Sequence, residues 1–169
     1  MMTETMWEGR FLAVRKNGTW EYAERQGQIG AAVIVAIDDA DRLVLVEQHR
    51  IPIGRRTLEL PAGLVGDEDA GESLADAAAR ELEEETGYRP ANVEELGLFY
   101  SSPGMTSESF TIVRATGLTK VGEGGGSAEE DITVHLVPIA EVPAYVRRAR
   151  ETGLGIDAKM LLVLDYATM

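Results

Sequence analysis

Short apolar runs separated by polar turns extend along most of the chain, a pattern typical of a domain that mixes strands and helices. The clearest run, residues 29–37 (IGAAVIVAI), is rich in β-branched residues and predicts a buried strand. After the acidic turn at residues 38–41 the apolar pattern resumes. The strands predicted in this way are residues 29–37, 42–47, 58–60, 93–100, 109–116 and 132–137.

One helix has clear signals at both ends. Ser73 is a good N-cap, and Asp76 three residues later gives a near capping box. The helix is predicted to run to about Thr86, where Gly87 ends it. The other predicted segments are a Gly-rich acidic loop at residues 61–71, a flexible loop at 122–127 and helical stretches at about 139–151 and 156–167.

The order of the elements favours one main domain with a small N-terminal appendage. No linker is long enough to separate domains, so we expect an α/β or α+β domain over residues 29–169, built around a mixed sheet. Residues 1–28 form the appendage, expected to be a small β unit, which offers apolar anchors without a clear long element. These anchors are Trp7, Phe11, Trp20 and Tyr22.

The charge and cysteine content of the chain exclude several classes of function. The net charge of −13 argues against broad binding to nucleic acids or anionic membranes, which depends on a basic surface. A phosphorylated small molecule stays compatible, because bound cations reverse the sign of charge within one cleft. The chain has no cysteine, which excludes disulfides and zinc–thiolate sites. Since no apolar run is long enough to span a membrane and the N-terminus does not resemble a signal peptide, we expect a cytoplasmic protein.

Four glutamates near the end of the predicted helix are the most informative feature. Glu81, Glu83, Glu84 and Glu85 put like charges one turn apart. They also place anions at a helix C-terminus, where they oppose the helix dipole. An ordinary surface helix would avoid this arrangement, whereas a helix that holds divalent cations needs it.

Helical phasing divides these glutamates. At about 100° per residue, Glu81 and Glu85 fall on the side of Leu74, which should face the protein, while Glu83 faces solvent and Glu84 lies on a flank. Buried carboxylates without partners are costly, so they require protonation, a basic partner or a metal. Oxygen ligands at this density suit Mg²⁺ or Mn²⁺.

The alternative is a solvated acidic helix on which Arg80 and other bases pair with the glutamates. Charge runs are usually surface faces, so this alternative is the default for an arbitrary acidic run. Here Glu81 and Glu85 lie on the same side of the helix as the apolar stripe, which weakens this alternative. The Gly-rich acidic loop before the helix weakens it further.

The whole run resembles the Nudix box, G-x5-E-x7-R-E-U-x-E-E-x-G-U, in which U is aliphatic or bulky and apolar. Every fixed position is filled, from Gly66 and Glu72 through Arg80 and the glutamates to Gly87 and Tyr88. The resemblance implies an α/β/α sandwich and hydrolysis of a nucleoside diphosphate linked to another moiety.

The resemblance also implies roles for individual residues. Glu81 and Glu85 become the principal metal ligands, with Glu84 close by. Arg80 would orient the glutamates, and Glu72 would fix the loop, with a water-mediated metal contact. The backbone carbonyl of Ala62 completes the metal shell in related enzymes, so the same role is expected here.

The glycine end of the motif leaves two alternatives open. In similar proteins the glycine of the "PAG" triplet is usually the box glycine, but here Gly63 has Asp69 six residues later, whereas Gly66 has Glu72. Either the loop bulges with Gly63 in its usual place, or Gly66 takes the box role.

Pro103 lies 16 residues after Gly87, a spacing that resembles the ADP-ribose (ADP-sugar) pyrophosphatase subgroup. Its surroundings, Gly104, Met105 and Glu108, resemble the "SPG…E" loop of that subgroup, although Ser-Pro-Gly is also common turn chemistry.

Two further stretches agree with this subgroup. Arg50 ends a stretch that resembles the "EQxR" segment, which implies that its side chain contacts substrate phosphate; without the resemblance a surface ion pair is an equal alternative. Glu129 and Glu130 lie in a segment that resembles the acidic loop supplying a catalytic base or an extra metal ligand. Of the two we favour Glu130; a solvated loop would fit either residue alone.

The resemblance therefore predicts hydrolysis of ADP-ribose, or of a similar nucleotide sugar, to AMP and a sugar phosphate. The reaction would depend on Mg²⁺, or on Mn²⁺, with two or three ions per site. A loop glutamate, or Glu108, would accept the proton of the attacking water. Trp20 and Tyr22 are candidates for stacking on adenine, although packing in the core or at an interface is the more common role for such residues.

The resemblance also implies a homodimer. The alternatives are a hydrolase of GDP-mannose or another nucleotide sugar, and a non-catalytic ADP-ribose sensor.

Overall fold

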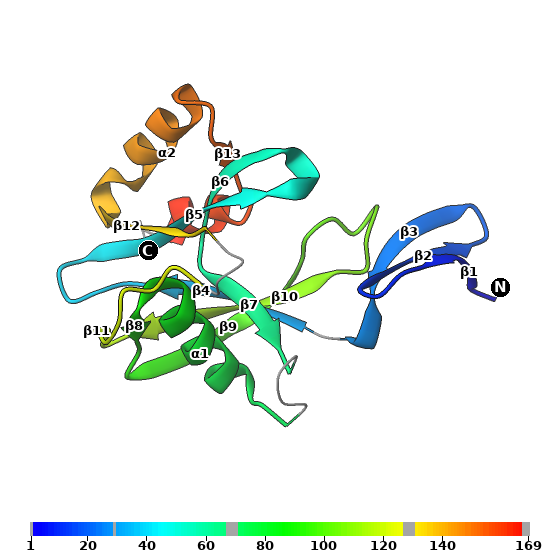
Figure 1. The fold of residues 1–169 in the computed structure, drawn as a ribbon, viewed down its shortest axis with the longest axis horizontal. Coiled ribbons are helices and arrows are strands. Elements are labelled where there is room, and N and C mark those ends of the chain that lie inside the picture. Colours follow the sequence, from blue (N-terminus) through cyan, green and yellow to red (C-terminus); the bar gives the residue numbers. More distant parts are fainter. Residues whose placement is uncertain (1, 29, 67–70, 127–130, 167–169) are drawn as a thin grey trace.

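The structure is a computed structural model that describes residues 2–28, 30–66, 71–126 and 131–166 (Figure 1). The strands are β1 (Glu4–Glu8), β2 (Leu12–Asn17), β3 (Trp20–Arg25), β4 (Gly30–Ala36), β5 (Arg42–Arg50), β6 (Arg55–Glu59), β7 (Ala62–Val65), β8 (Tyr88–Arg89), β9 (Asn92–Tyr100), β10 (Ser109–Thr116), β11 (Thr119–Lys120), β12 (Thr133–Pro138) and β13 (Gly155–Ile156). The helices are α1 (Leu74–Thr86), α2 (Val142–Glu151) and α3 (Met160–Tyr166), with 3₁₀ turns η1 (Gln26–Gln28), η2 (Ile51–Ile53) and η3 (Ile139–Glu141).

Two four-stranded mixed sheets form the main body. The first has the order β7-β4-β10-β9, in which β4 and β10 are parallel and the other neighbours are antiparallel. The second has the order β12-β5-β6-β13, and its β6–β13 pair is parallel. A two-stranded pair, β11-β8, follows the end of α1.

Strand β4 is buried on both of its faces, which explains its uninterrupted apolar sequence. Successive side chains of a strand point to opposite faces. Val33 and Val35 therefore join the cluster that includes α2 and α3, while Ala32 and Ile34 join the cluster beneath α1. Helices thus cover both faces of the sheets, the predicted sandwich.

Helix α1 begins and ends where the sequence predicts. The Ser73 side chain accepts a hydrogen bond from the backbone N–H of Asp76, and Gly87 ends the helix with a φ of 73°. Ala78 and Leu82 are buried on the side that packs against β4, so the apolar stripe fixes which face of the helix meets the sheet.

The segment predicted as a loop at residues 61–71 begins instead with strand β7. Its residues pair with the edge of β4, from Ala62 opposite Val33 to Val65 opposite Gly30. The prediction failed because Pro61 and Gly63 read as turn residues, whereas the edge of β4 offers backbone partners that only the tertiary fold brings into reach. Strand β5 likewise extends past the predicted residue 47 to Arg50, because β6 pairs along its length.

The N-terminal residues form a three-stranded antiparallel sheet, β1-β2-β3, that extends away from the main body in Figure 1. One contact with the main body is a parallel bridge between Ala23 and Thr106. The Ala23 N–H donates to the Met105 carbonyl at 2.9 Å, and the Ser107 N–H donates to the Ala23 carbonyl at 3.0 Å. The appendage is therefore joined to the loop that contains Pro103.

Within the described ranges, no helix has the length and apolar character that crossing a membrane requires.

Leu82→Ala tests the packing of α1 on the sheet. Leu82 is fully buried, so we expect the variant to lower the free energy of unfolding by about 2–5 kcal/mol through lost burial and the cavity left behind. Urea denaturation measures this change. Leu161→Ala is the matched control, because Leu161 is 65% exposed and the same substitution there should have little effect. Equal effects of the two variants would contradict the assigned packing.

Candidate active site

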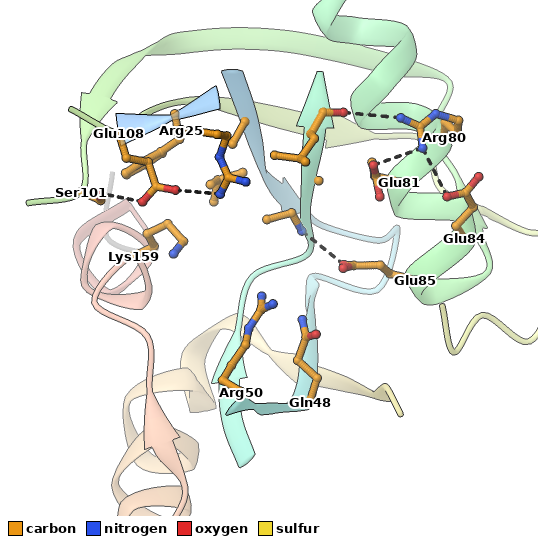
Figure 2. A pocket seen from close by; sticks show the side chains of 16 residues that line it. Arg25, Gln48, Arg50, Arg80, Glu81, Glu84, Glu85, Ser101, Glu108 and Lys159 are labelled. Carbon is orange, nitrogen blue, oxygen red and sulfur yellow. Dashed lines mark hydrogen bonds and ion pairs between the residues drawn. The ribbon is translucent and has the colours of Figure 1, made fainter. Parts of the chain in front are cut away.

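An open cleft of about 480 Å³ lies between α1 and the two sheets (Figure 2). Acidic side chains of α1 form one wall, and basic side chains from several other elements face it. The lining residues are Arg25, Ala31, Val33, Gln48, Arg50, Ala62, Gly63, Leu64, Arg80, Glu81, Glu84, Glu85, Ser101, Glu108, Phe110 and Lys159.

The glutamates of α1 differ in burial much as helical phasing predicts. Glu85 is 5% exposed, and the Glu81 side chain is 14% exposed. The side chains of Glu84 and Glu83 are 50% and 37% exposed. Glu83 is less exposed than Glu84 although it faces away from the sheet, because Arg89 covers it with two hydrogen bonds.

Arg80 connects the acidic wall to the loop before the helix. Its guanidinium binds Glu72 at 3.0 and 3.2 Å, Glu81 at 3.1 Å and Glu84 at 3.3 Å. The hydrogen bond with Glu72 raises the pKa of Arg80 above its usual range, and the charges of Glu81 and Glu84 add to this effect. A permanently charged Arg80 therefore balances carboxylates that would otherwise repel one another.

Strand β7 lies against the two inward glutamates and Arg80. The Ala62 N–H donates to Glu85 Oε2 at 3.2 Å, and a further hydrogen bond joins Arg80 to the Leu64 carbonyl at 3.4 Å. Between them, a Cβ placed on Gly63 would lie 1.9 Å from Cδ of Glu81. The backbone of β7 and the carboxylate of Glu81 approach this closely only because residue 63 has no side chain.

This packing separates the roles of the two glycines that the sequence left open. Gly63 provides the close approach to Glu81. Gly66 has a φ of 83° and follows the end of β7, so it supplies the left-handed backbone at the turn into the loop.

Arg50, on the opposite side of the cleft, is held rigidly by a buried carboxylate. Its Nε and Nη2 donate to the two oxygens of Glu59 at 2.8 and 2.7 Å, and the Thr57 hydroxyl donates to Glu59 at 2.6 Å. Glu59 is 3% exposed. The hydrogen bond with Glu59 raises the pKa of Arg50 above its usual range. A bidentate pair of this kind fixes the plane of the guanidinium.

The N-terminal appendage contributes Arg25 to the same cleft. Arg25 Nη2 lies 3.2 Å from Glu108 Oε1, and the Ser101 hydroxyl donates to Glu108 Oε2 at 2.9 Å. Figure 2 shows this group across the cleft from Glu81 and Glu84. The backbone bridge between β3 and residues 105–107 positions Arg25, so the N-terminal appendage borders the cleft of its own chain.

The donor chemistry of the acidic wall fits a divalent cation. Glu81, Glu84 and Glu85 are carboxylates on one helix, and hard oxygen ligands are those that Mg²⁺ and Mn²⁺ prefer. Across the described ranges, no group of three or more His, Cys, Asp or Glu side chains is arranged so as to hold an ion. Since Arg80 binds Glu81 and Glu84, joint coordination requires these two carboxylates to turn away from Arg80.

Many of the residues proposed from the sequence line the cleft. Those that do are Arg50, Ala62, Arg80, Glu81, Glu84, Glu85 and Glu108. Glu72 is not a lining residue but forms an ion pair with Arg80. Pro103, Gly104, Met105, Trp20 and Tyr22 are not among the lining residues, and their roles stay predictions. Glu129 and Glu130 lie outside the described residues.

Sequence reasoning missed Arg25, Ser101 and Lys159 as cleft residues. Arg25 ends the alternating stretch that forms β3, but nothing in the sequence shows that β3 bridges to the loop near Met105. Lys159 lies in the C-terminal segment, more than one hundred positions from Arg50 in the sequence, and no motif indicates that the two share a cleft.

Comparison with known proteins identifies the class of this fold and site. The NUDIX domain model matches residues 28–163, so the chain belongs to the Nudix family. The resemblance drawn from the glutamate helix and the predicted fold class are therefore confirmed. Members of this family generally use divalent metal ions.

Three relatives are similar over nearly the whole chain. An ADP-ribose pyrophosphatase of Mycobacterium tuberculosis is 38% identical, covering 98% of this chain and 83% of the relative. A methanol dehydrogenase activator of Bacillus methanolicus is 32% identical, covering 97% and 89%. A solved structure described as an ADP compounds hydrolase aligns with a TM-score of 0.74 at 24% identity, covering 98% and 91% of the two chains, and supports the fold.

Gly63→Ala tests the close approach of β7 to Glu81. The added methyl group would overlap the Glu81 carboxylate, so we expect a loss of activity on the order of 100-fold from displacement of that side chain. Steady-state kinetics measures the loss. Gly30→Ala on the neighbouring strand is the matched control, because nothing lies within 4 Å of its new Cβ and its activity should be retained. Full activity of Gly63→Ala would refute the packing argument.

Proposed function

We propose that this chain hydrolyses the diphosphate bond of ADP-ribose, or of a similar nucleoside diphosphate sugar, to give AMP and a sugar phosphate. The observation that carries the proposal is the polarity of the cleft, in which the α1 glutamates face Arg50, Arg25 and Lys159. An acidic wall alone would repel a diphosphate, whereas an acidic wall that holds cations opposite a basic wall favours one. Family membership and the similarity to an ADP-ribose pyrophosphatase support the same substrate class.

The metal would be Mg²⁺, or Mn²⁺, held by Glu81 and Glu85 with Glu84 close by and, as the family resemblance implies, the carbonyl of Ala62. Two or three ions per site fit the number of carboxylates. Ions in this place would neutralise the anionic oxygens of the diphosphate and lower the pKa of a water that they bind. Arg80 would hold Glu81 and Glu84 between turnovers, and Glu72 would anchor Arg80 with an indirect contact to the metal.

The remaining residues bind the substrate and move one proton. Arg50, fixed by Glu59, keeps N–H donors available for phosphate oxygens. A water oxygen attacks one phosphorus, the bond to the bridging oxygen breaks, and a carboxylate accepts the proton of the water. Candidates for that carboxylate are Glu130, Glu129 and Glu108. The loop with Pro103, Gly104 and Met105 would border the sugar side, and Trp20 or Tyr22 would stack on adenine.

A substrate panel with product identification tests this proposal. We expect AMP and ribose 5-phosphate from ADP-ribose in the presence of Mg²⁺, and weaker turnover of GDP-mannose. Preferred turnover of GDP-mannose would show that guanine is the preferred nucleobase, while the proposed reaction would stand. Binding of ADP-ribose with Mg²⁺ and no AMP formed would contradict hydrolysis and favour a sensing module.

Glu81→Gln tests the metal assignment. Loss of the charge should abolish metal-dependent turnover while the unfolding transition stays close to that of the parent protein. Glu83→Gln is the matched control on the same helix, because Glu83 faces away from the cleft and pairs with Arg89. We expect turnover of the control within about threefold of the parent, since exposed ion pairs contribute little. Undiminished turnover of Glu81→Gln would refute the assignment.

We propose further that residues 1–28 are a dimer-forming appendage of a Nudix domain at residues 29–169. The sheet β1-β2-β3 exposes Trp7, Phe11 and Trp20, which are 58%, 64% and 62% exposed. A second copy of this chain would cover such side chains, and the removal of their apolar surface from water favours association.

Sedimentation equilibrium tests the dimer. The protein should have about twice the chain mass of 18.3 kDa, and Phe11→Asp should shift it toward the monomer by placing a charge in the apolar contact. Leu161→Asp is the control, because Leu161 is as exposed as Phe11 but lies on α3. A monomer at all concentrations would contradict the proposal.

A further inference from the structure

The C-terminal segment brings Lys159 to the wall of the cleft. Strand β13 pairs in parallel with β6, with Gly155 opposite Thr57 and Ile156 opposite Leu58. The Asp157 N–H then donates to the Leu58 carbonyl at 3.1 Å. Since Leu58 precedes Glu59, the backbone that carries Lys159 is tied to the strand that holds the partner of Arg50.

The Lys159 side chain is held in place but keeps unused hydrogen-bonding capacity. Its ammonium lies 2.5 Å from Asp157 Oδ2 and 5.8 Å from the centroid of the Phe110 ring, and the side chain is 24% exposed. Figure 2 shows Lys159 near Glu108 and Arg25, among the side chains that line the cleft. An ammonium has three donors, and within the described residues one hydrogen bond, to Asp157, engages it.

A purely structural role explains this arrangement poorly. Asp157 already serves the local turn through Oδ1, which accepts the Lys159 backbone N–H at 2.7 Å, and this bond needs no lysine side chain. A partly exposed ion pair between neighbouring residues contributes little to stability. The local turn therefore does not need the lysine side chain, whose ammonium lies beside the cleft where it can bind an anion.

The position of Lys159 relative to Arg50 limits which part of a ligand it meets. The raised pKa of Arg50 comes first from its hydrogen bond with Glu59, with smaller contributions from the charges of Glu85 and Asp157. Independently of the pKa, Arg50 and Lys159 line the same cleft as the α1 glutamates (Figure 2). A diphosphate bound between the α1 glutamates and Arg50 would have one of its phosphates close to Lys159.

We propose that Lys159 is a substrate-binding residue whose ammonium donates hydrogen bonds to anionic phosphate oxygens of the nucleoside diphosphate, next to Arg50. This inference rests on the proposed function for its ligand class. It adds a cation from the C-terminal segment to the one from β5 and the one from the N-terminal appendage. Asp157 is a positioning residue that keeps the ammonium directed along the cleft.

The test compares Lys159→Met, Lys159→Arg and the control Arg147→Met, which removes one positive charge from the exposed face of α2. For ADP-ribose with Mg²⁺, Lys159→Met should raise KM about tenfold, as expected for a lost hydrogen bond to a charged group, with kcat within about twofold. Lys159→Arg should recover part of the affinity because it keeps the charge, and Arg147→Met should match the parent.

Binding of ADP, measured by titration calorimetry with Mg²⁺, separates this inference from the proposed function. Lys159→Met should weaken ADP binding about tenfold whether or not any nucleotide sugar is turned over. The salt dependence of ADP affinity should also decrease, since one screened charge is lost.

A structural role predicts a different pattern. Lys159→Met and Asp157→Asn would lower the melting temperature alike, and KM for ADP-ribose and Kd for ADP would stay at the parent values. That result overturns the inference, as does an unchanged Kd for ADP in a normally folded Lys159→Met protein.

Discussion

The site depends on the compensation of carboxylate charge at the C-terminal half of α1. Glutamates one turn apart repel one another, and anions at this end oppose the helix dipole. Arg80 offsets both effects by binding Glu72, Glu81 and Glu84 together. Its hydrogen bond to the Leu64 carbonyl extends the same network into β7. The helix, the loop before it and the edge of the first sheet are therefore held by one guanidinium, and an acidic surface can be kept beside a packed core.

Packing on both faces of β4 places that acidic surface opposite a basic one. One face of the strand packs on α1 through Ala78 and Leu82, the other packs with α2 and α3, and β5 of the second sheet contributes side chains to both clusters. Because β5 and β6 belong to that second sheet, Arg50 and Glu59 come to face α1 across an open cleft. The cleft is thus a consequence of how the two sheets pack together through both clusters.

The cations of the cleft share a common arrangement. Arg50 pairs with Glu59, Arg25 with Glu108 and Lys159 with Asp157. Each carboxylate limits the motion of a long side chain, which reduces the ordering cost when an anionic ligand binds. The three cations come from β5, the N-terminal appendage and the C-terminal segment, so distant parts of the chain meet at one site.

The sequence by itself determined the strand β4, the limits of α1, the family, and which glutamates face inward. These features depend on local signals: an apolar run, a Ser73 cap, a Gly87 stop and a helical period. Only the tertiary structure decided that residues 62–65 form a strand, that Gly63 touches Glu81, and that Arg25 and Lys159 share a cleft with Arg50. Those features require backbone pairing or side-chain proximity between segments far apart in the chain, and neither residue type nor local spacing encodes such distances.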